Sequence, residues 1–292
     1  MIRFPESFAF ITDEVSQDPR DAVRFAARHD LTQVELRSAF GRQFRELTDT
    51  DVAELKKRFA DAGLTVVACD TPVFKCALGD VAALRVHREL FRRSIEIAQT
   101  LDAPLLRVFT FLRDKRALSD ARTREIAEHL NQLAEQLPPR MALGVENEAS
   151  CQVATAAETA RLFELLPSPR IGIVWDPCNV LYVPGPPSSI HEGFAAIAPR
   201  VIHVHAKDAA RAGATAVAAP LGTGDVDWPG EFRALTAAGY DGPVSLETHW
   251  RQTALAESAL HLPGGFAFSH GGAAASEACL RALPALLSQG AT

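Results

Sequence analysis

Residues 201–208 read VIHVHAKD, a short apolar run that ends in polar and charged side chains. Runs of this length, rich in Val, Ile, Leu or Phe and bounded by polar residues, are typical of strands buried in a parallel sheet. We find eight such runs: Phe8–Thr12, Gln33–Arg37, Thr65–Cys69, Leu105–Phe109, Met141–Glu146, Ile171–Asp176, Val201–His205 and Pro243–Glu247.

Amphipathic stretches with helical spacing lie between these runs. In Asp51–Ala62, for example, the apolar residues Val52, Leu55 and Phe59 recur every three or four positions, and Gly63 follows where a C-terminal cap belongs. Similar spacing predicts helices over Asp21–Arg28, Leu84–Thr100, Arg122–Gln136, Ala156–Leu166, Glu231–Ala238 and Glu277–Ser288, with a weaker one over Ile190–Ile197.

Eight alternating strand and helix units predict an α/β protein, a (β/α)8 TIM barrel that forms a single domain over residues 1–292. An open doubly wound sheet also alternates in this way. Its GxGxxG phosphate fingerprint is missing after the first strand, and the close glycine pair Gly222 and Gly224 comes late in the chain. We expect the Gly/Ala-rich segment Pro263–Ala275 to form a flexible loop before the last helix.

The composition narrows the class of function. The 292 residues are 47% hydrophobic and 23% charged, as in ordinary globular proteins, and the formal net charge is −6. This charge favours neither nucleic acid nor a membrane surface as a partner. The five cysteines are scattered without a CxxC pair, which predicts neither disulfides nor a thiolate zinc site. Because the chain shows no signal peptide and no long apolar run, we expect a cytoplasmic protein.

Polar residues end four successive strands of the predicted barrel. They are Glu146, Asp176, His205 and Glu247, and the C-terminal ends of the strands form the active site of such a barrel. Three carboxylates that converge in a partly desolvated mouth repel one another, and a shared proton, a nearby Lys or Arg, or a divalent cation relieves this repulsion. A divalent cation is the simplest of these three solutions. The oxygen-rich donor set favours one Mn²⁺ ion, while Mg²⁺, Co²⁺ and Zn²⁺ also suit it.

Several motifs resemble those of one known superfamily. They read VELR at 34–37, VEN at 145–147, WDPCN at 175–179, HVHAKD at 203–208, and PLGTGDVDW at 220–228 followed by GYDGPVSLE at 239–247. Over about residues 8–250 the chain is similar to the xylose isomerase-like TIM barrels, which include sugar phosphate isomerases and epimerases and the AP endonuclease family 2 type.

The resemblance implies a metal site and a mechanism. In this superfamily a Glu, an Asp, a His and a Glu hold the metal, and they match Glu146, Asp176, His205 and Glu247. In the epimerase branch the two glutamates exchange protons with the substrate on opposite faces of a cis-enediolate that the cation stabilises. The resemblance thus implies a metal-dependent isomerase or epimerase acting on a small-molecule carbohydrate, whether a sugar, a sugar acid or a sugar phosphate. Relatives are often homodimers or homotetramers.

Further polar residues near the predicted mouth are candidates for substrate binding: Lys207, Asn179, Glu35, Arg37, Lys75, Arg113 and His249. Lys207 shares a strand face with His205 and suits an anionic substrate group. Asn179 stands where the epimerases commonly have a His, so their substrate contacts at that position cannot be transferred unchanged.

Most of the other candidates have a structural alternative. Glu35 and Arg37 are spaced to form an internal ion pair. The alternative for Arg113 is an ordinary surface arginine, and the alternative for His249 is a side chain that only faces solvent. His203 lies one step deeper than His205, where an orienting role is expected.

Three rival functions remain. A dehydratase of a cyclic polyol or keto acid, like inosose or dehydroshikimate dehydratase, uses the same metal site and differs in its products. An endonuclease IV-like DNA repair enzyme requires three metals with extra His ligands on earlier strands, and those strand ends carry no His here. A non-catalytic sugar-binding barrel usually loses the metal ligands, whereas this chain has all four candidates.

Overall fold

The barrel sheet consists of eight strands whose neighbours all pair in parallel. The computed structural model describes residues 2–114, 116–183, 193–213, 215–253 and 265–290. Its sheet has the order β1-β12-β9-β8-β7-β6-β5-β2, and a parallel bridge between Ile11 and Glu35 joins the two edge strands. The strands are β1 (Phe8–Phe10), β2 (Gln33–Leu36), β5 (Thr65–Asp70), β6 (Leu105–Val108), β7 (Ala142–Glu146), β8 (Ile171–Trp175), β9 (Val201–Ala206) and β12 (Val244–Leu246). The predicted (β/α)8 barrel and its eight strands are confirmed.

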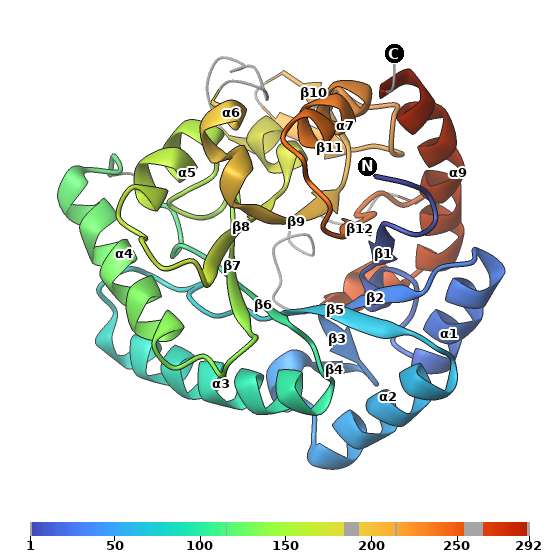
Figure 1. Cartoon of the computed structure of the whole chain (residues 1–292), viewed down its shortest axis with the longest axis horizontal. Coiled ribbons are helices and arrows are strands. Elements are labelled where there is room, and N and C mark those ends of the chain that lie inside the picture. The colour runs from blue at the N-terminus through green and yellow to red at the C-terminus, as the bar shows by residue number, and fades with distance from the viewer. Residues whose placement is uncertain (1, 115, 184–192, 214, 254–264, 291–292) are drawn as a thin grey trace.

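Helices surround this sheet, as Figure 1 shows in the view along the barrel. They are α1 (Pro19–Arg28), α2 (Asp49–Asp61), α3 (Val81–Thr100), α4 (Asp120–Ala134), α5 (Ala156–Phe163), α6 (Phe194–Ile197), α7 (Trp228–Ala237) and α9 (Gly272–Gly290). Most begin two or three residues before the apolar periodicity does, because capping residues set the start. Thr48 and Asp80, for example, accept hydrogen bonds from the backbone N–H groups of Asp51 and Ala83.

A small apolar cluster of Ala68, Leu105 and Val174 fills the inside of the barrel below the polar strand ends. Gly144 and Gly172 make this packing possible, since a Cβ at either position would lie 2.6 Å from Val174 or 2.5 Å from Ile202. A much larger apolar core lies between the sheet and the helices. Because these apolar side chains fill the barrel interior, the polar side chains of the strands lie above them, at the C-terminal ends of the strands.

Short elements decorate the loops of the barrel. Two hairpins, β3 (Ser38–Ala39) with β4 (Arg42–Gln43) and β10 (Ala209–Ala212) with β11 (Thr215–Ala218), follow β2 and β9. The 3₁₀ helices are η1 (Thr12–Glu14), η2 (Phe44–Glu46), η3 (Pro177–Tyr182), η4 (Ala198–Arg200) and η5 (Gly265–Ser269).

The expectation of a flexible loop over Pro263–Ala275 is wrong for the part that the structure describes. Residues Gly265–Ser269 form η5, and α9 already begins at Gly272. Close packing orders this segment, because Gly265 and Gly272 lie directly against Asp13 and the Glu14 carbonyl. Residues 263 and 264, and residues 190–192 of the weaker predicted helix, lie outside the described residues.

The cysteine and membrane expectations can also be compared with the structure. All five cysteines are free and buried. Burial raises the pKa of the Cys76 thiol to about 11, which makes it a poor nucleophile. Among the described helices, none is long and apolar enough to cross a bilayer.

Candidate metal centre at the mouth of the barrel

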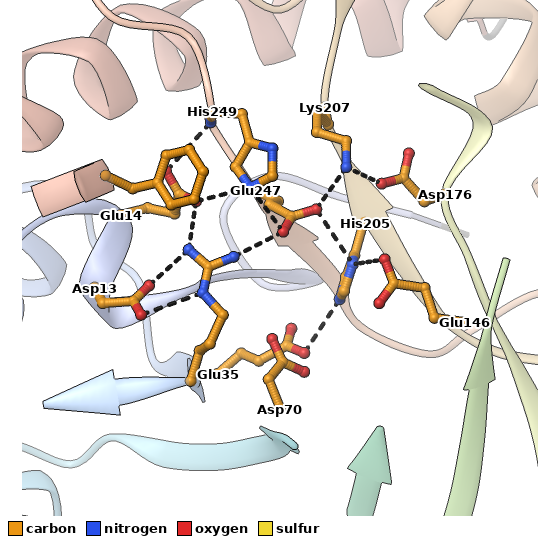
Figure 2. A network of polar contacts seen from close by, with 12 residues as sticks. Asp13, Glu14, Glu35, Asp70, Glu146, Asp176, His205, Lys207, Glu247 and His249 are labelled. Atoms are coloured by element: carbon orange, nitrogen blue, oxygen red, sulfur yellow. Dashed lines mark hydrogen bonds and ion pairs between the residues drawn. The ribbon is translucent and has the colours of Figure 1, made fainter. Parts of the chain in front are cut away.

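Four neighbouring strands bring the predicted metal ligands together. Glu146 ends β7, Asp176 follows β8, His205 lies in β9 and Glu247 follows β12. Each offers a ligand atom, and these atoms all lie within 4.8 Å of one another. Figure 2 shows the four side chains pointing toward a common centre. All four are buried.

His205 faces the carboxylates with one ring nitrogen and Glu35 with the other. Its Nδ1 lies 3.4 Å from Glu146 Oε1 and 3.6 Å from Glu247 Oε2, while its Nε2 lies 3.1 Å from Glu35 Oε1. The buried Nδ1 has no hydrogen-bond partner. A buried nitrogen of this kind, beside three carboxylates, fits the coordination of a divalent cation.

Lys207 supplies a positive charge at the edge of this cluster. Its Nζ lies 2.6 Å from Asp176 Oδ2 and 2.9 Å from Glu247 Oε2, and it donates to Asn179 Oδ1 at 3.1 Å. Lys207 therefore lies against two candidate ligands rather than free in the mouth, where it was expected to meet an anionic substrate.

Two arginines hold the two glutamates from opposite sides of the site. Arg37 donates to Glu247 Oε1 at 2.8 Å and to Glu14 Oε1 at 2.6 Å. The Arg107 Nε lies 3.1 Å from Glu146 Oε2 and 3.2 Å from Asp70 Oδ1. Each glutamate is thus held in place by a buried guanidinium, and Arg107 binds one further carboxylate while Arg37 binds two.

The pKa values of the buried groups reflect this charge distribution. Burial acts to raise the pKa of Glu247, but His249 and Lys207 outweigh it and hold this pKa well below the usual range. The pKa of Asp176 is raised to about 7, chiefly by burial, with Lys207 opposing and the neighbouring glutamates adding to the rise. Burial acts to lower the pKa of His205, yet the Glu35 and Glu146 carboxylates raise it well above the ordinary value. The field that draws a proton to this imidazole equally attracts a metal cation.

Glu35 lies beneath His205 and contacts a second imidazole. His203 Nε2 lies 2.8 Å from Glu35 Oε2. Asp70 also hydrogen bonds to Glu35, and burial together with Glu35 raises the pKa of Asp70 well above its usual range despite the opposing charge of Arg107. Burial acts to raise the pKa of Glu35, but His203 and His205 outweigh it and hold this pKa well below the usual range, so Glu35 is the carboxylate that accepts from both imidazoles.

The predicted ion pair between Glu35 and Arg37 is wrong. Glu35 binds His203 and His205, whereas Arg37 binds Asp13, Glu14 and Glu247. The register of β2 against β5 shifts between Val34 and Glu35. Both side chains reach across the barrel mouth to other strands instead of meeting along their own.

A cavity of about 60 Å³ opens above the cluster. Of the residues predicted from the sequence, it is lined by Arg37, Lys75, Glu146, Glu247 and His249. Its other walls are Gln43, Phe44, Asp70, Thr71, Pro72, Arg107, Phe109, Glu148 and Phe268. These walls combine charged, polar and aromatic side chains, as the walls of small-molecule sites do.

The remaining substrate-binding candidates lie in different surroundings. Asn179 is buried and donates to Glu146 Oε1 at 3.3 Å. Lys75 lies 3.6 Å from Glu148 and above the Phe109 ring. His249 Nε2 lies 3.1 Å from Glu247 Oε1, and its ring stacks on Phe268. Arg113 instead binds Glu158 at 2.8 Å and does not line the cavity.

Several residues of this site were missed in the sequence. Asp13 and Glu14 directly follow the first apolar run, so the rule that found the four ligands would have found them too. Arg107 lies within an apolar run, where a charge is itself a signal. No sequence signal identified Phe268, because it lies in the segment that was expected to be a flexible loop.

The late glycine pair surrounds an aspartate. The Asp208 carboxylate accepts hydrogen bonds from the backbone N–H groups of Gly222, Gly224 and Val226. A Cβ at Gly224 would lie 2.2 Å from Asp208 Oδ1. The glycines of the 220–228 motif therefore let the backbone of this loop fold closely around the Asp208 carboxylate.

Comparisons with known proteins agree with this architecture. A family model described as xylose isomerase-like TIM barrel matches residues 23–266. The solved structure of the IOLI protein with a bound zinc atom is similar, with 15% identity, a TM-score of 0.77, and coverage of 97% of this chain and 98% of that one.

Two further solved structures carry enzyme names. A D-allulose 3-epimerase from Methylomonas sp. has 17% identity and a TM-score of 0.72, with 98% of this chain and 100% of that one covered. The probable 3-DHS dehydratase AsbF from Bacillus anthracis has 15% identity and a TM-score of 0.71, with 95% and 98% covered. At these identities the likeness shows the fold.

Proposed function

The chain belongs to the xylose isomerase-like TIM barrel family, and we propose that it is a divalent-metal-dependent isomerase or epimerase of a small carbohydrate. One observation carries the proposal. The carboxylates of Glu146 and Glu247 both approach the unpartnered Nδ1 of His205, at 3.4 Å and 3.6 Å, and both line the cavity.

The metal would be held by Glu146, Asp176, His205 and Glu247. These three carboxylates and one imidazole favour Mn²⁺, and Mg²⁺, Co²⁺ or Zn²⁺ also fit the donor set. When bound, the cation supplies a Lewis acid that polarises a carbonyl and stabilises negative charge on oxygen.

Glu146 and Glu247 would move the protons. They approach the cavity from β7 and β12, which are separated in the sheet by β8 and β9. A substrate between them has one carboxylate on either side. Lys207, Arg37 and His249 hold Glu247 ionised at neutral pH, ready to accept a proton from the carbon beside the carbonyl. Glu146, held by Arg107, would return a proton from the other side.

The charges around the cavity favour an uncharged substrate. Among the described residues that line it, the three cations Arg37, Lys75 and Arg107 each already have a carboxylate partner, at 2.6 to 3.6 Å. Lys207 is engaged with Asp176 and Glu247. A phosphate or carboxylate group on the substrate would have to displace one of these pairs, so we favour a neutral ketose over a sugar phosphate or a sugar acid.

The test is hydrogen exchange in D₂O. The Mn²⁺-loaded protein is incubated with a panel of free ketoses and their phosphates, and NMR measures deuterium at the carbon beside the carbonyl. We expect exchange with at least one free ketose and none in the Glu146→Gln and Glu247→Gln variants. A product that has lost water would instead indicate the dehydratase, and no reaction with any member of the panel would contradict the proposal.

A further inference from the structure

The interior of the barrel contains a second buried cluster directly beneath the candidate ligands. Glu35 on β2 accepts from two imidazoles of β9, with His203 Nε2 at 2.8 Å and His205 Nε2 at 3.1 Å. All three side chains are fully buried. Glu35 does not line the cavity, so a direct contact with substrate does not explain it.

Glu35 determines where His205 carries its hydrogen. A carboxylate can only accept hydrogen bonds, so the His205 Nε2 must be the donor. A neutral imidazole has one hydrogen, and placing it on Nε2 leaves a lone pair on Nδ1. That Nδ1 faces Glu146 Oε1 at 3.4 Å and Glu247 Oε2 at 3.6 Å without a hydrogen-bond partner. A lone pair turned toward two carboxylates is unfavourable by itself, and either a proton on Nδ1 or a metal cation between the three groups relieves the repulsion.

The same three residues could themselves be considered a metal site. Their hydrogen bonding argues against it, because each imidazole Nε2 already pairs with a different oxygen of Glu35, at 2.8 Å and 3.1 Å. His203 also shares its Nε2 with the Ser245 hydroxyl at 3.0 Å. The cluster is thus hydrogen bonded as it stands.

We propose that Glu35 is a positioning residue of the metal centre, which fixes His205 with its hydrogen on Nε2 and so presents the Nδ1 lone pair to the cation. The inference rests on the proposed metal site. A ligand imidazole held by a carboxylate in this way binds a cation more tightly than one free to rotate.

The first experiment measures the affinity for Zn²⁺ and Mn²⁺ by calorimetry. In Glu35→Gln the amide accepts with one atom and donates with the other, so it cannot accept from both imidazoles. We expect its metal affinity to fall about 10- to 100-fold. Two matched variants should bind metal as the wild type does. Ser245→Ala removes only the hydroxyl beside His203, and Glu158→Gln removes a carboxylate that accepts from the Thr155 N–H at the start of α5, away from the ligands.

The second experiment needs no variant. Long-range ¹H–¹⁵N NMR of the Zn²⁺-loaded wild type identifies which nitrogen of His205 carries hydrogen, and we expect Nε2. A hydrogen on Nδ1 overturns the inference, as does a folded Glu35→Gln protein with wild-type metal affinity. Loss of metal binding in His203→Asn but not in Asp176→Asn would place the ion at Glu35 and overturn it as well. If the wild type binds no metal at all, the proposed function itself fails, which is a distinct result.

Discussion

The two halves of the barrel mouth carry different kinds of residue. Strands β7, β8, β9 and β12 end in the four candidate ligands, whose donor atoms point at one centre. Strands β2 and β6 instead precede or carry Arg37 and Arg107, which bind those ligands. Strands β1 and β5 precede or carry the carboxylates of Asp13 and Asp70, which bind these two arginines. A carboxylate cluster buried this deeply needs a second set of charges around it. Changes in the first half should therefore act on metal and chemistry, and changes in the second half on stability and orientation.

The largest effect is expected from the ligand half. Glu247→Gln keeps the shape of the side chain but removes its ability to accept a proton. Exchange of substrate hydrogen with solvent should fall about 10²- to 10⁴-fold or become undetectable, while circular dichroism remains that of the wild type. Full activity of the Glu247→Gln protein would show that this residue takes no part in the reaction. It would also contradict the proposed difference in role between the two halves of the mouth.

In the supporting half, Arg37→Met should chiefly reduce stability. It would leave Asp13, Glu14 and Glu247 buried without their shared guanidinium. Removing one partner of such a buried pair costs about 3–5 kcal/mol, measured as the free energy of unfolding in urea with chelator present. Lys57→Met, which breaks an exposed pair with Asp61 on α2, is the control and should change little. Equal losses in the two variants would show that the buried pairs contribute no more than surface ones.

Glu231 on α7 provides a buried carboxyl outside both halves. Burial raises its pKa to about 8, although the Trp175 indole donates to it at 3.2 Å. In the unfolded chain it titrates near 4.3, so between these values only the folded protein keeps the proton. Stability should therefore decrease as the pH rises from about 4.5 to 8. Glu231→Gln removes the titrating carboxyl and with it this pH dependence. The free energy of unfolding of the variant should therefore rise relative to that of the wild type from pH 5 to pH 8. Parallel pH profiles in urea unfolding would refute this assignment.

The smallest effect is expected from Arg113, which belongs to neither half. It was a substrate-binding candidate, but it binds Glu158 and the Cys151 carbonyl and does not line the cavity. Arg113→Ala should leave both KM and metal affinity within about twofold of the wild type, since a partly exposed pair contributes little. A large rise in KM would restore the residue to the site.

Sequence reasoning predicted the barrel and brought the four ligand candidates to one place. Glu146, Asp176, His205 and Glu247 end successive apolar runs, and parallel strands in a barrel align these ends. Apolar runs identify the strands, and the barrel places the C-terminal ends of its strands at one mouth. This inference needs no knowledge of how the side chains pack.

The supporting half was less accessible to such reasoning. The spacing of Glu35 and Arg37 pointed to a pair along one strand, but their partners come from β9, β12 and the segment after β1. Which side chains meet across a closed barrel depends on register and bulges, and β2 carries such an irregularity next to Glu35. Phe268 was hidden for another reason, since contacts with Asp13, Glu14 and Arg251 order its segment despite its loop-like composition.

The most direct test of the central claim is the metal content per chain, measured by elemental mass spectrometry after purification without chelator and after reconstitution with Mn²⁺. Four converging ligands predict about one tightly bound divalent ion in the wild type and its loss in Glu146→Ala. Three ions per chain would favour the nuclease-like alternative. No ion under either condition, or an unchanged content in Glu146→Ala, would contradict the account.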